Sequence, residues 1–252
     1  MTKQPWSAAL PLVQTQQAQE PKPFTFVIPF YENPSFLQQQ LAWWSTYPAW
    51  LRRYLSAIIV DDGSPAPAVL PKDRPFPIQL FRIDQDVRWN WLAARNIGLH
   101  HAAEGWCLLT DIDHVVPEST AAACVFRRHD PGTIYGFSRA EHTGEALAPH
   151  PNSWFLTRER FWAVGGYDET LSGHYGTDGD WRRRCAAAGP MAILWDRLIR
   201  HEHMGDSSTT RYLRKQPEDA GVRRLVAARG KHWRPKTLSF PYHEVTREAV
   251  CP

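Results

Sequence analysis

Two aspartates, Asp111 and Asp113, closely follow a short apolar run at residues 106–109. Such a run predicts a strand buried on both faces, and in open α/β sheets ligands bind beyond the carboxyl ends of the strands. Residues two apart in an extended chain point the same way, so both carboxylates can face one hard cation such as Mg²⁺ or Mn²⁺. A cation held there can carry a diphosphate. Taken alone, the Asp-x-Asp pattern also fits a strand-to-loop transition with two solvated acids.

Three other groups of polar residues have types and spacings that suit chemistry. Residues 61–65 are a turn-forming cluster, which taken alone is an ordinary Asx-type turn. Asp178 and Asp180 precede a helical pattern, where negative charge also favours the helix dipole. His201 and His203 lie two apart, a spacing that suits either metal ligands or two strand residues on one face without a metal.

The elements that must position these residues alternate along the chain. We expect strands at residues 24–30, 54–60, 78–83 and 106–110, and helices at residues 35–44, 92–103 and 181–188. Strands that alternate with helices imply a mainly parallel sheet, and loops from several strands then converge at one edge. The expected fold class is therefore α/β, with a central sheet flanked by helices.

Composition and charge exclude several classes of protein. The 252 residues include 29 Lys and Arg against 26 Asp and Glu, a formal net charge of +3. This excess is small and dispersed, so we expect no nucleic-acid partner. The four cysteines have no paired zinc-ligand spacing and are too few for a secreted disulfide scaffold, which suits a reducing compartment. No apolar run approaches membrane-spanning length, so we expect a soluble, cytoplasmic protein.

Six segments, in their order and separations, resemble the glycosyltransferases of family 2, which have the GT-A (nucleotide-diphosphosugar transferase) fold. They are residues 27–32, 60–64, 93–98, 110–113, 165–169 and 176–181. Each segment is weakly specific alone, whereas their order makes the combination specific. The resemblance extends over roughly residues 24–203 and implies a Rossmann-like GT-A sheet with a C-terminal helical extension.

The resemblance divides the chain into three parts. Residues 1–23 are rich in Gln, Ala and Pro and are expected to be an extended or flexible arm. Residues 24–210 are the expected GT-A domain, whose first half (24–115) would bind the nucleotide-sugar and whose second half (116–210) would bind the acceptor. Residues 211–252 are a basic, initially helical extension, for which a solvated helix packing one apolar side on the core is the favoured interpretation. Peripheral contact with a membrane surface is the alternative if the acceptor is lipid-linked.

The resemblance assigns five residues to the nucleotide-sugar. Tyr31 corresponds to the position that stacks on the base, with Pro29 and Glu32 beside it in the same segment. Asp62 corresponds to the carboxylate that accepts a hydrogen bond from an imide N–H of the base. Uracil has such a donor, so the implied donor substrate is a UDP-sugar. Arg95 lies in the segment that contacts phosphate or sugar in such enzymes.

A divalent cation, Mn²⁺ or Mg²⁺, is also implied by the resemblance. Asp113 would be its principal contact, while Asp111 would contact the ribose or a metal-bound water. His203 best matches the late histidine of the family, with His201 as the alternative ligand. The cation would neutralise the charge that builds on the departing diphosphate.

Inverting glycosyl transfer needs a base that removes the proton of the acceptor hydroxyl. The resemblance places Asp178 at the catalytic aspartate, and Asp180 is the alternative base. Thr177 replaces the glutamate that precedes the aspartate in the family, which puts that glutamate's acceptor contacts in doubt. Asp168 and Glu169 match residues that lie near the sugar in relatives.

The expected reaction is the addition of a single sugar to a glycan or lipid-linked glycan, because the chain lacks the Gln-x-x-Arg-Trp element and the membrane spans of processive synthases. A nucleotidyltransferase on the same fold is one alternative. It would need a glycine-rich phosphate loop directly after the first strand, and residues 29–33 are not one. A non-catalytic nucleotide-sugar or glycan-binding module is another alternative.

Overall fold

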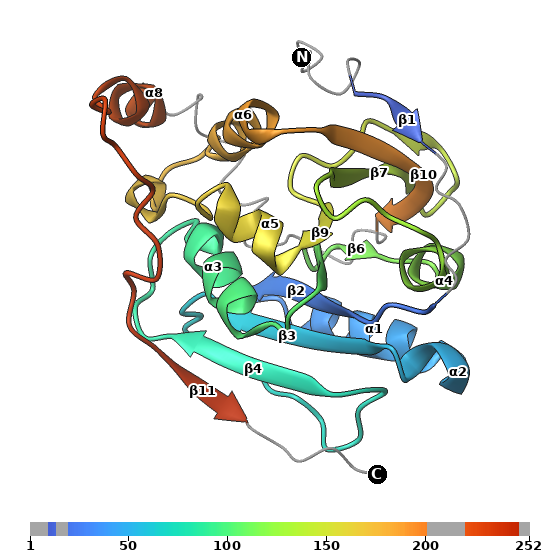
Figure 1. The fold of residues 1–252 in the computed structure, drawn as a ribbon. Helices are drawn as coiled ribbons and strands as arrows, with labels where there is room; N and C mark the ends of the chain where they lie inside the picture. The colour runs from blue at the N-terminus through green and yellow to red at the C-terminus, as the bar shows by residue number, and fades with distance from the viewer. Residues whose placement is uncertain (1–9, 14–19, 201–219, 247–252) are drawn as a thin grey trace.

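A mixed β-sheet with helices on both faces forms the body of the protein (Figure 1). The computed structural model describes residues 10–13, 20–200 and 220–246. The strand order across the sheet is β1 (Leu12–Val13), β10 (Met191–Arg200), β7 (Ile134–Glu141), β9 (Trp154–Thr157), β5 (Trp106–Leu109), β2 (Phe24–Phe30), β3 (Leu55–Asp61), β4 (Ile78–Ile83) and β11 (Tyr242–Thr246). Two short strands lie off this path: β6 (His114–Val115) pairs with β10, and β8 (Ala146–Leu147) pairs with β7.

The centre of the sheet is parallel. Strand β2 pairs in parallel with β3 on one side and with β5 on the other, and β3 pairs in parallel with β4. These strands are apolar on both faces because helices cover both: in β2, Phe26 and Ile28 face one core cluster while Val27 faces the other. The carboxyl ends of β2, β3 and β5 therefore meet at one edge of the sheet.

Two helical layers enclose the sheet. The first core cluster joins it to α1 (Pro34–Ser45), α2 (Ala49–Arg52) and α4 (Glu118–Phe126). The second joins it to α3 (Trp91–His101), α5 (Arg158–Ala163) and α6 (Asp178–Ala188). The short 3-10 helix η1 (Glu169–Leu171) and helix α8 (Ala220–Ala227) complete the described elements.

The structure confirms the expected α/β fold. Strands at residues 24–30 and 78–83 are as expected, and those expected at 54–60 and 106–110 lie at Leu55–Asp61 and Trp106–Leu109. Two features were not expected. Strand β9 runs antiparallel between β5 and β7, and β11 of the C-terminal extension pairs antiparallel with β4. The other neighbouring pairs along the path are parallel, so the sheet is mainly parallel, as expected. Among the described residues, no helix has the length and apolarity needed to span a bilayer.

Candidate active site

The turn after β3 is built by Asp61. Its Oδ1 accepts a hydrogen bond from the Ser64 backbone (2.8 Å), and its Oδ2 accepts from the Ala68 backbone and from Arg82 Nη1 (both 2.8 Å). Gly63 has φ +73°, and a Cβ there would lie 2.3 Å from the Gln85 carbonyl oxygen. The chain is therefore tightly packed at this turn. Residues 61–65 form the Asx-type turn, and the turn fixes the position of Asp62.

Asp62 is buried at 4% exposure and has spare capacity to accept a hydrogen bond. Its Oδ1 has no hydrogen-bond partner among the described residues. Burial raises the pKa of Asp62 well above its usual range; Asp61 and Asp86 raise it further, and a hydrogen bond from the Asn90 backbone partly opposes them. A buried, unpartnered carboxylate oxygen is costly unless a ligand supplies an N–H or O–H donor.

The loop after β2 is attached to the loops after β3 and β4. The Glu32 backbone N–H donates to Ser64 Oγ (3.0 Å), and Glu32 has a positive φ of 45°. The Tyr31 hydroxyl donates to Asp86 Oδ1 (3.1 Å). Pro29 lies within β2, in register with Val60 of β3. These contacts place the Tyr31 ring at the same sheet edge as Asp62.

Arg95 fixes the position of Asp111. The Arg95 side chain is fully buried, and its Nη2 lies 2.5 Å from Asp111 Oδ1. Its Nη1 donates to the Asn152 carbonyl (2.5 Å) and to the Tyr167 hydroxyl (3.2 Å). Burial and the nearby Asp113 raise the pKa of Asp111, although Arg95 opposes them. The Asp111 side chain is 32% exposed. Arg95 therefore fixes its position while part of the carboxylate stays accessible.

His114 orients Asp113. Arg139 Nη1 lies 3.3 Å from His114 Nε2. Because arginine can only donate, Nε2 is the acceptor and the ring proton is on Nδ1, which donates to Asp113 Oδ1 (2.7 Å). Burial opposes ionisation of Asp113, but the interactions with His114, with His150 and with a backbone N–H together outweigh it, and the pKa of Asp113 is lowered. Asp113 is thus an ionised carboxylate, 39% exposed in its side chain.

The loop that bears both aspartates is a turn, which differs from the extended geometry expected from the sequence. The His114 N–H donates to the Asp111 carbonyl (3.1 Å). Gln40 of α1 donates to the Ile112 carbonyl (3.2 Å) and to the His114 carbonyl. Thr110 still donates to the Val27 carbonyl of β2 (3.3 Å), and the contacts of His114 and Gln40 then hold residues 111–114 in the turn.

Sequence reasoning missed His150. Its Nε2 lies 3.5 Å from Asp111 Oδ2, and its ring packs on that of His114 with centroids 4.3 Å apart. Burial lowers the pKa of His150 well below its usual range, so the ring is neutral. Sequence reasoning gave no role to His114 either, although it adjoins Asp113, whereas His150 reaches the site from a distant loop and had no local signal.

Metal ligation is only partly represented among the described residues. Asp111 and Asp113 offer the hard oxygen ligands that Mg²⁺ and Mn²⁺ prefer. Within the part of the chain that the structure describes, no group of three His, Cys, Asp or Glu side chains is placed to hold a metal ion. The predicted ligands His201 and His203 lie outside the described residues. Asp111 and Asp113 are therefore the candidate metal ligands within the described residues.

Asp178 is the first residue of α6, and its loop contacts the Asp62 region. Its side chain is 19% exposed and lies 3.2 Å from Arg182 Nη2. In the preceding loop, Ser172 Oγ donates to Asn90 Oδ1 (2.5 Å). The Tyr175 ring packs on Trp89 with centroids 5.2 Å apart. Because the Asn90 backbone also bonds to Asp62, these contacts join the loop of Asp178 to the site at the sheet edge.

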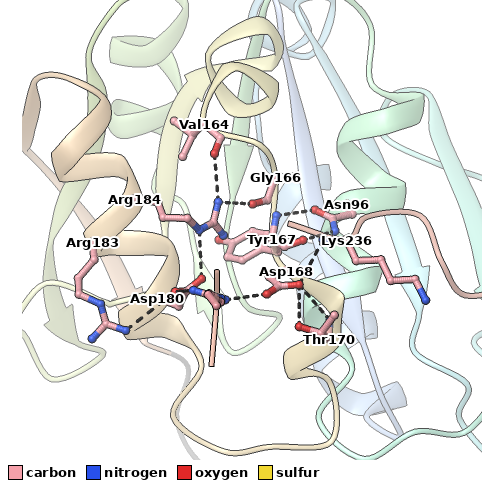
Figure 2. A network of polar contacts seen from close by, with 11 residues as sticks. Asn96, Val164, Gly166, Tyr167, Asp168, Thr170, Asp180, Arg183, Arg184 and Lys236 are labelled. Carbon is pink, nitrogen blue, oxygen red and sulfur yellow. Dashed lines mark hydrogen bonds and ion pairs between the residues drawn. The ribbon is translucent and has the colours of Figure 1, made fainter. Parts of the chain in front are cut away.

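Asp180 belongs to a buried ion-pair cluster. Its Oδ2 lies 3.0 Å from Arg184 Nε, and its Oδ1 lies 2.5 Å from Arg229 Nη1. Arg229 Nη2 also contacts Asp168 Oδ2 at 2.6 Å. Figure 2 shows Asp168, Asp180 and Arg184 within this network. The contacts leave Asp180 engaged on both oxygens.

Asp168 and Glu169, expected near the sugar, hold the C-terminal segment in the structure. Asp168 Oδ1 accepts from the Lys236 backbone (3.2 Å). Glu169 accepts from the backbone of Leu238 (2.7 Å) and of Ser239 (2.6 Å). Both carboxylates are buried, so their role here is to attach residues 229–239 to the body of the protein.

Comparison with known proteins gives a family and a fold. Residues 25–183 match the family described as Glycosyl transferase family 2. No curated protein has a significantly matching sequence.

Solved structures share the fold at low sequence identity. GalNAc-T7 with UDP, GalNAc and Mn²⁺ superposes with a TM-score of 0.59 at 14% identity, over 83% of this chain and 48% of that one. TarS of S. aureus gives 0.54 at 13% identity, over 71% and 37%. TarS 1–349 in complex with UDP-GlcNAc gives 0.53 at 12% identity, over 73% and 60%. The chain thus spans 37–60% of the length of these structures.

Proposed function

The chain belongs to glycosyl transferase family 2, and from that premise we propose that it transfers a single sugar from a UDP-sugar to a hydroxyl of a glycan or lipid-linked glycan, with a divalent cation and with inversion. The observation that carries the proposal is the buried, unpartnered Oδ1 of Asp62 at the carboxyl end of β3. The imide N–H of uracil is a donor that would satisfy this oxygen. Tyr31 would then lie against the face of the base.

The diphosphate would lie beside Asp111 and Asp113. Asp113, ionised and oriented by His114, is the residue assigned to hold Mn²⁺ or Mg²⁺, with His203 as a further ligand and Asp111 facing the ribose or a metal-bound water. When bound, the cation supplies Lewis acidity that stabilises the leaving diphosphate. The proposed role of Arg95 is to orient Asp111 through their ion pair.

Asp178 is the proposed base. The acceptor oxygen forms a bond with the anomeric carbon, the bond from that carbon to the diphosphate oxygen breaks, and the hydroxyl proton passes to the Asp178 carboxylate. We prefer Asp178 to Asp180 because the Asp178 side chain is 19% exposed on the loop that reaches Asn90, whereas Asp180 is buried between Arg184 and Arg229.

Calorimetric titration with UDP, GDP, CDP and dTDP, each with and without Mn²⁺, tests the proposal. We expect metal-dependent binding with a preference for UDP, and weak binding of CDP because cytosine has no imide N–H. Asp113→Asn should remove the metal-dependent part of the affinity. Asp73→Asn, which changes an exposed aspartate elsewhere, should leave it intact. Binding of no nucleotide would contradict the proposal and favour a glycan-binding module.

A further inference from the structure

Arg229 lies outside the family-matched residues and joins two parts of the active-site half. Its Nη1 contacts Asp180 Oδ1 at 2.5 Å and its Nη2 contacts Asp168 Oδ2 at 2.6 Å. The guanidinium also packs over the Trp233 ring, with its carbon 3.6 Å from the centroid. A planar fork with two donor edges suits such a bridge, which a single ammonium group cannot reproduce.

The Arg229 bridge joins the two ends of the segment between Asp168 and Asp180. Asp168 precedes η1, and Asp180 lies in the first turn of α6, two residues after Asp178. Between them, Gly173 and Gly176 have positive φ, and a Cβ at either would meet no atom within 4 Å. The middle of the loop is therefore loosely packed, and its conformation depends on its anchored ends and on the contacts with Trp89 and Asn90.

The other oxygens of both carboxylates already have partners. Arg184 Nε contacts Asp180 Oδ2, and Asp168 Oδ1 accepts from Thr170 and from the Lys236 backbone. Figure 2 shows these contacts around Asp168 and Asp180. Arg184 Nη1 also donates to the carbonyls of Gly166 (2.7 Å) and Val164 (3.1 Å), which ties α6 to the segment before Asp168. Arg229 is the residue of the C-terminal segment that pairs with both Asp168 and Asp180 among the described residues.

We infer that Arg229 is a positioning residue for Asp178, through which the C-terminal segment sets the place of the proposed catalytic base. The inference rests on the proposed function. Fixing Asp180 to Asp168 fixes the first turn of α6, and Asp178 is part of that turn. A misplacement of about 1 Å in a reacting group can lower the rate about 100-fold, so a contact remote from the acceptor can control turnover.

Kinetics of Arg229→Gln test this role. We expect kcat for transfer to fall by about 10- to 100-fold, with the KM for the UDP-sugar and the Kd for UDP unchanged within about twofold. Arg183→Gln is the matched control, because Arg183 faces the same Asp180 oxygen at 3.9 Å but is 67% exposed. An equal loss of kcat in both variants, or an equal loss of UDP binding and kcat in Arg229→Gln, would overturn the inference.

Arg229→Lys is a second variant, which keeps the positive charge and can be measured if Arg229→Gln fails to fold. Because lysine cannot bridge both carboxylates and leaves one of them without this cation, we expect a cooperative melt at a lower Tm and a kcat reduced by about tenfold. Full activity in Arg229→Lys would overturn the inference, because a positive charge at residue 229 would then sustain turnover without the bridge.

Hydrogen exchange of residues 168–182 separates this inference from the proposed function. We expect faster exchange in Arg229→Lys than in the wild type or Arg183→Gln. If the wild type transfers no sugar from any UDP-sugar, the proposed function fails, while the exchange result still shows whether Arg229 fixes the loop. Unchanged exchange would overturn the inference in either case.

Discussion

At the residue scale, the base contact proposed for Asp62 would couple nucleotide recognition to the stability of the protein. The Asn90 backbone bonds to one carboxylate oxygen and Oδ1 is left unpartnered among the described residues. In Asp62→Asn, the amide oxygen would retain the Asn90 contact and the amide NH₂ would take the place of Oδ1. Two donors would then face each other when uracil binds, whereas cytosine N3 is an acceptor.

We therefore expect Asp62→Asn to weaken UDP binding by about 10- to 100-fold, the effect of losing a hydrogen bond to a charged group of roughly 1.5–3 kcal/mol. CDP binding should improve relative to UDP. Calorimetric titration of both nucleotides with Mn²⁺ measures the change. An unchanged ratio of UDP to CDP affinity would exclude Asp62 from contact with the base.

The same variant should stabilise the protein without nucleotide. Because the pKa of Asp62 is raised on folding, the folded state binds a proton more tightly than the unfolded chain, and stability falls as pH rises from the usual aspartate pKa through the raised value. Asparagine removes this titration. We expect the Tm of the variant to exceed that of the wild type at pH 7 and to equal it near pH 4. Thermal melts at both pH values check the sign.

Asp178 and Asp180 should behave differently although they lie two residues apart. Asp178→Asn should retain UDP binding and native melting and lose transfer, because only proton acceptance is removed. Asp180→Asn breaks buried ion pairs with Arg184 and Arg229, which costs about 3–5 kcal/mol and lowers Tm by about 10 °C. Melting curves and transfer rates of both variants separate the roles. Full transfer activity in Asp178→Asn would rule out Asp178 as the base.

At the element scale, the close approach of α3 to β2 would position the proposed donor site. A Cβ on Gly98 of α3 would lie 2.4 Å from Val27 Cγ1 of β2. We expect Gly98→Ala to push the helix outward, lower stability by about 1–3 kcal/mol and weaken UDP binding, because Arg95 on the same helix orients Asp111. Gly132→Ala is the control, since its nearest neighbour would be 3.4 Å away. Thermal melts and UDP titrations of both variants measure the effect.

Elements with strong local patterns could be predicted from the sequence. Strands β2 and β4 have the expected bounds because uninterrupted apolar runs end at turn-forming residues. Strand β9 was not placed because it runs directly into α5 with no turn-forming residue between them. Strand β11 was not placed because it pairs with a strand about 160 positions earlier. Such non-local pairing leaves no local pattern.

The candidate site was predictable where residues lie at strand ends. Asp62, Asp111 and Asp113 followed from their places after apolar runs, supported by the family resemblance. The contacts that support them came from distant segments: Gln40 from α1, and His150 from the loop before β9. Their partners depend on the folded arrangement, so residue type alone gave no reason to select them.

At the scale of the whole molecule, the C-terminal segment belongs to the same body as the family-matched residues. It runs from α8 to β11 along one side of the protein (Figure 1) and contacts Asp168, Glu169 and β4 on the way. Strand β11 is attached by backbone pairing with β4, by His243 to Asp84 (2.6 Å) and by Tyr242 to His101 (3.0 Å). Two truncations can therefore separate its functions.

Truncation after Phe240 removes β11 but keeps Arg229 and the contacts of Glu169. We expect a lower Tm and concentration-dependent aggregation, because the β4 edge is uncovered, with UDP binding and kcat retained within about twofold. Truncation before Ala220 removes the Arg229 bridge as well and should reduce kcat at least as much as Arg229→Gln. Melting, light scattering and transfer rates distinguish the two. If truncation after Phe240 abolished transfer although the protein still folded, the pairing of β11 with β4 would be what the C-terminal segment contributes to turnover. The Arg229 bridge would then not be the cause.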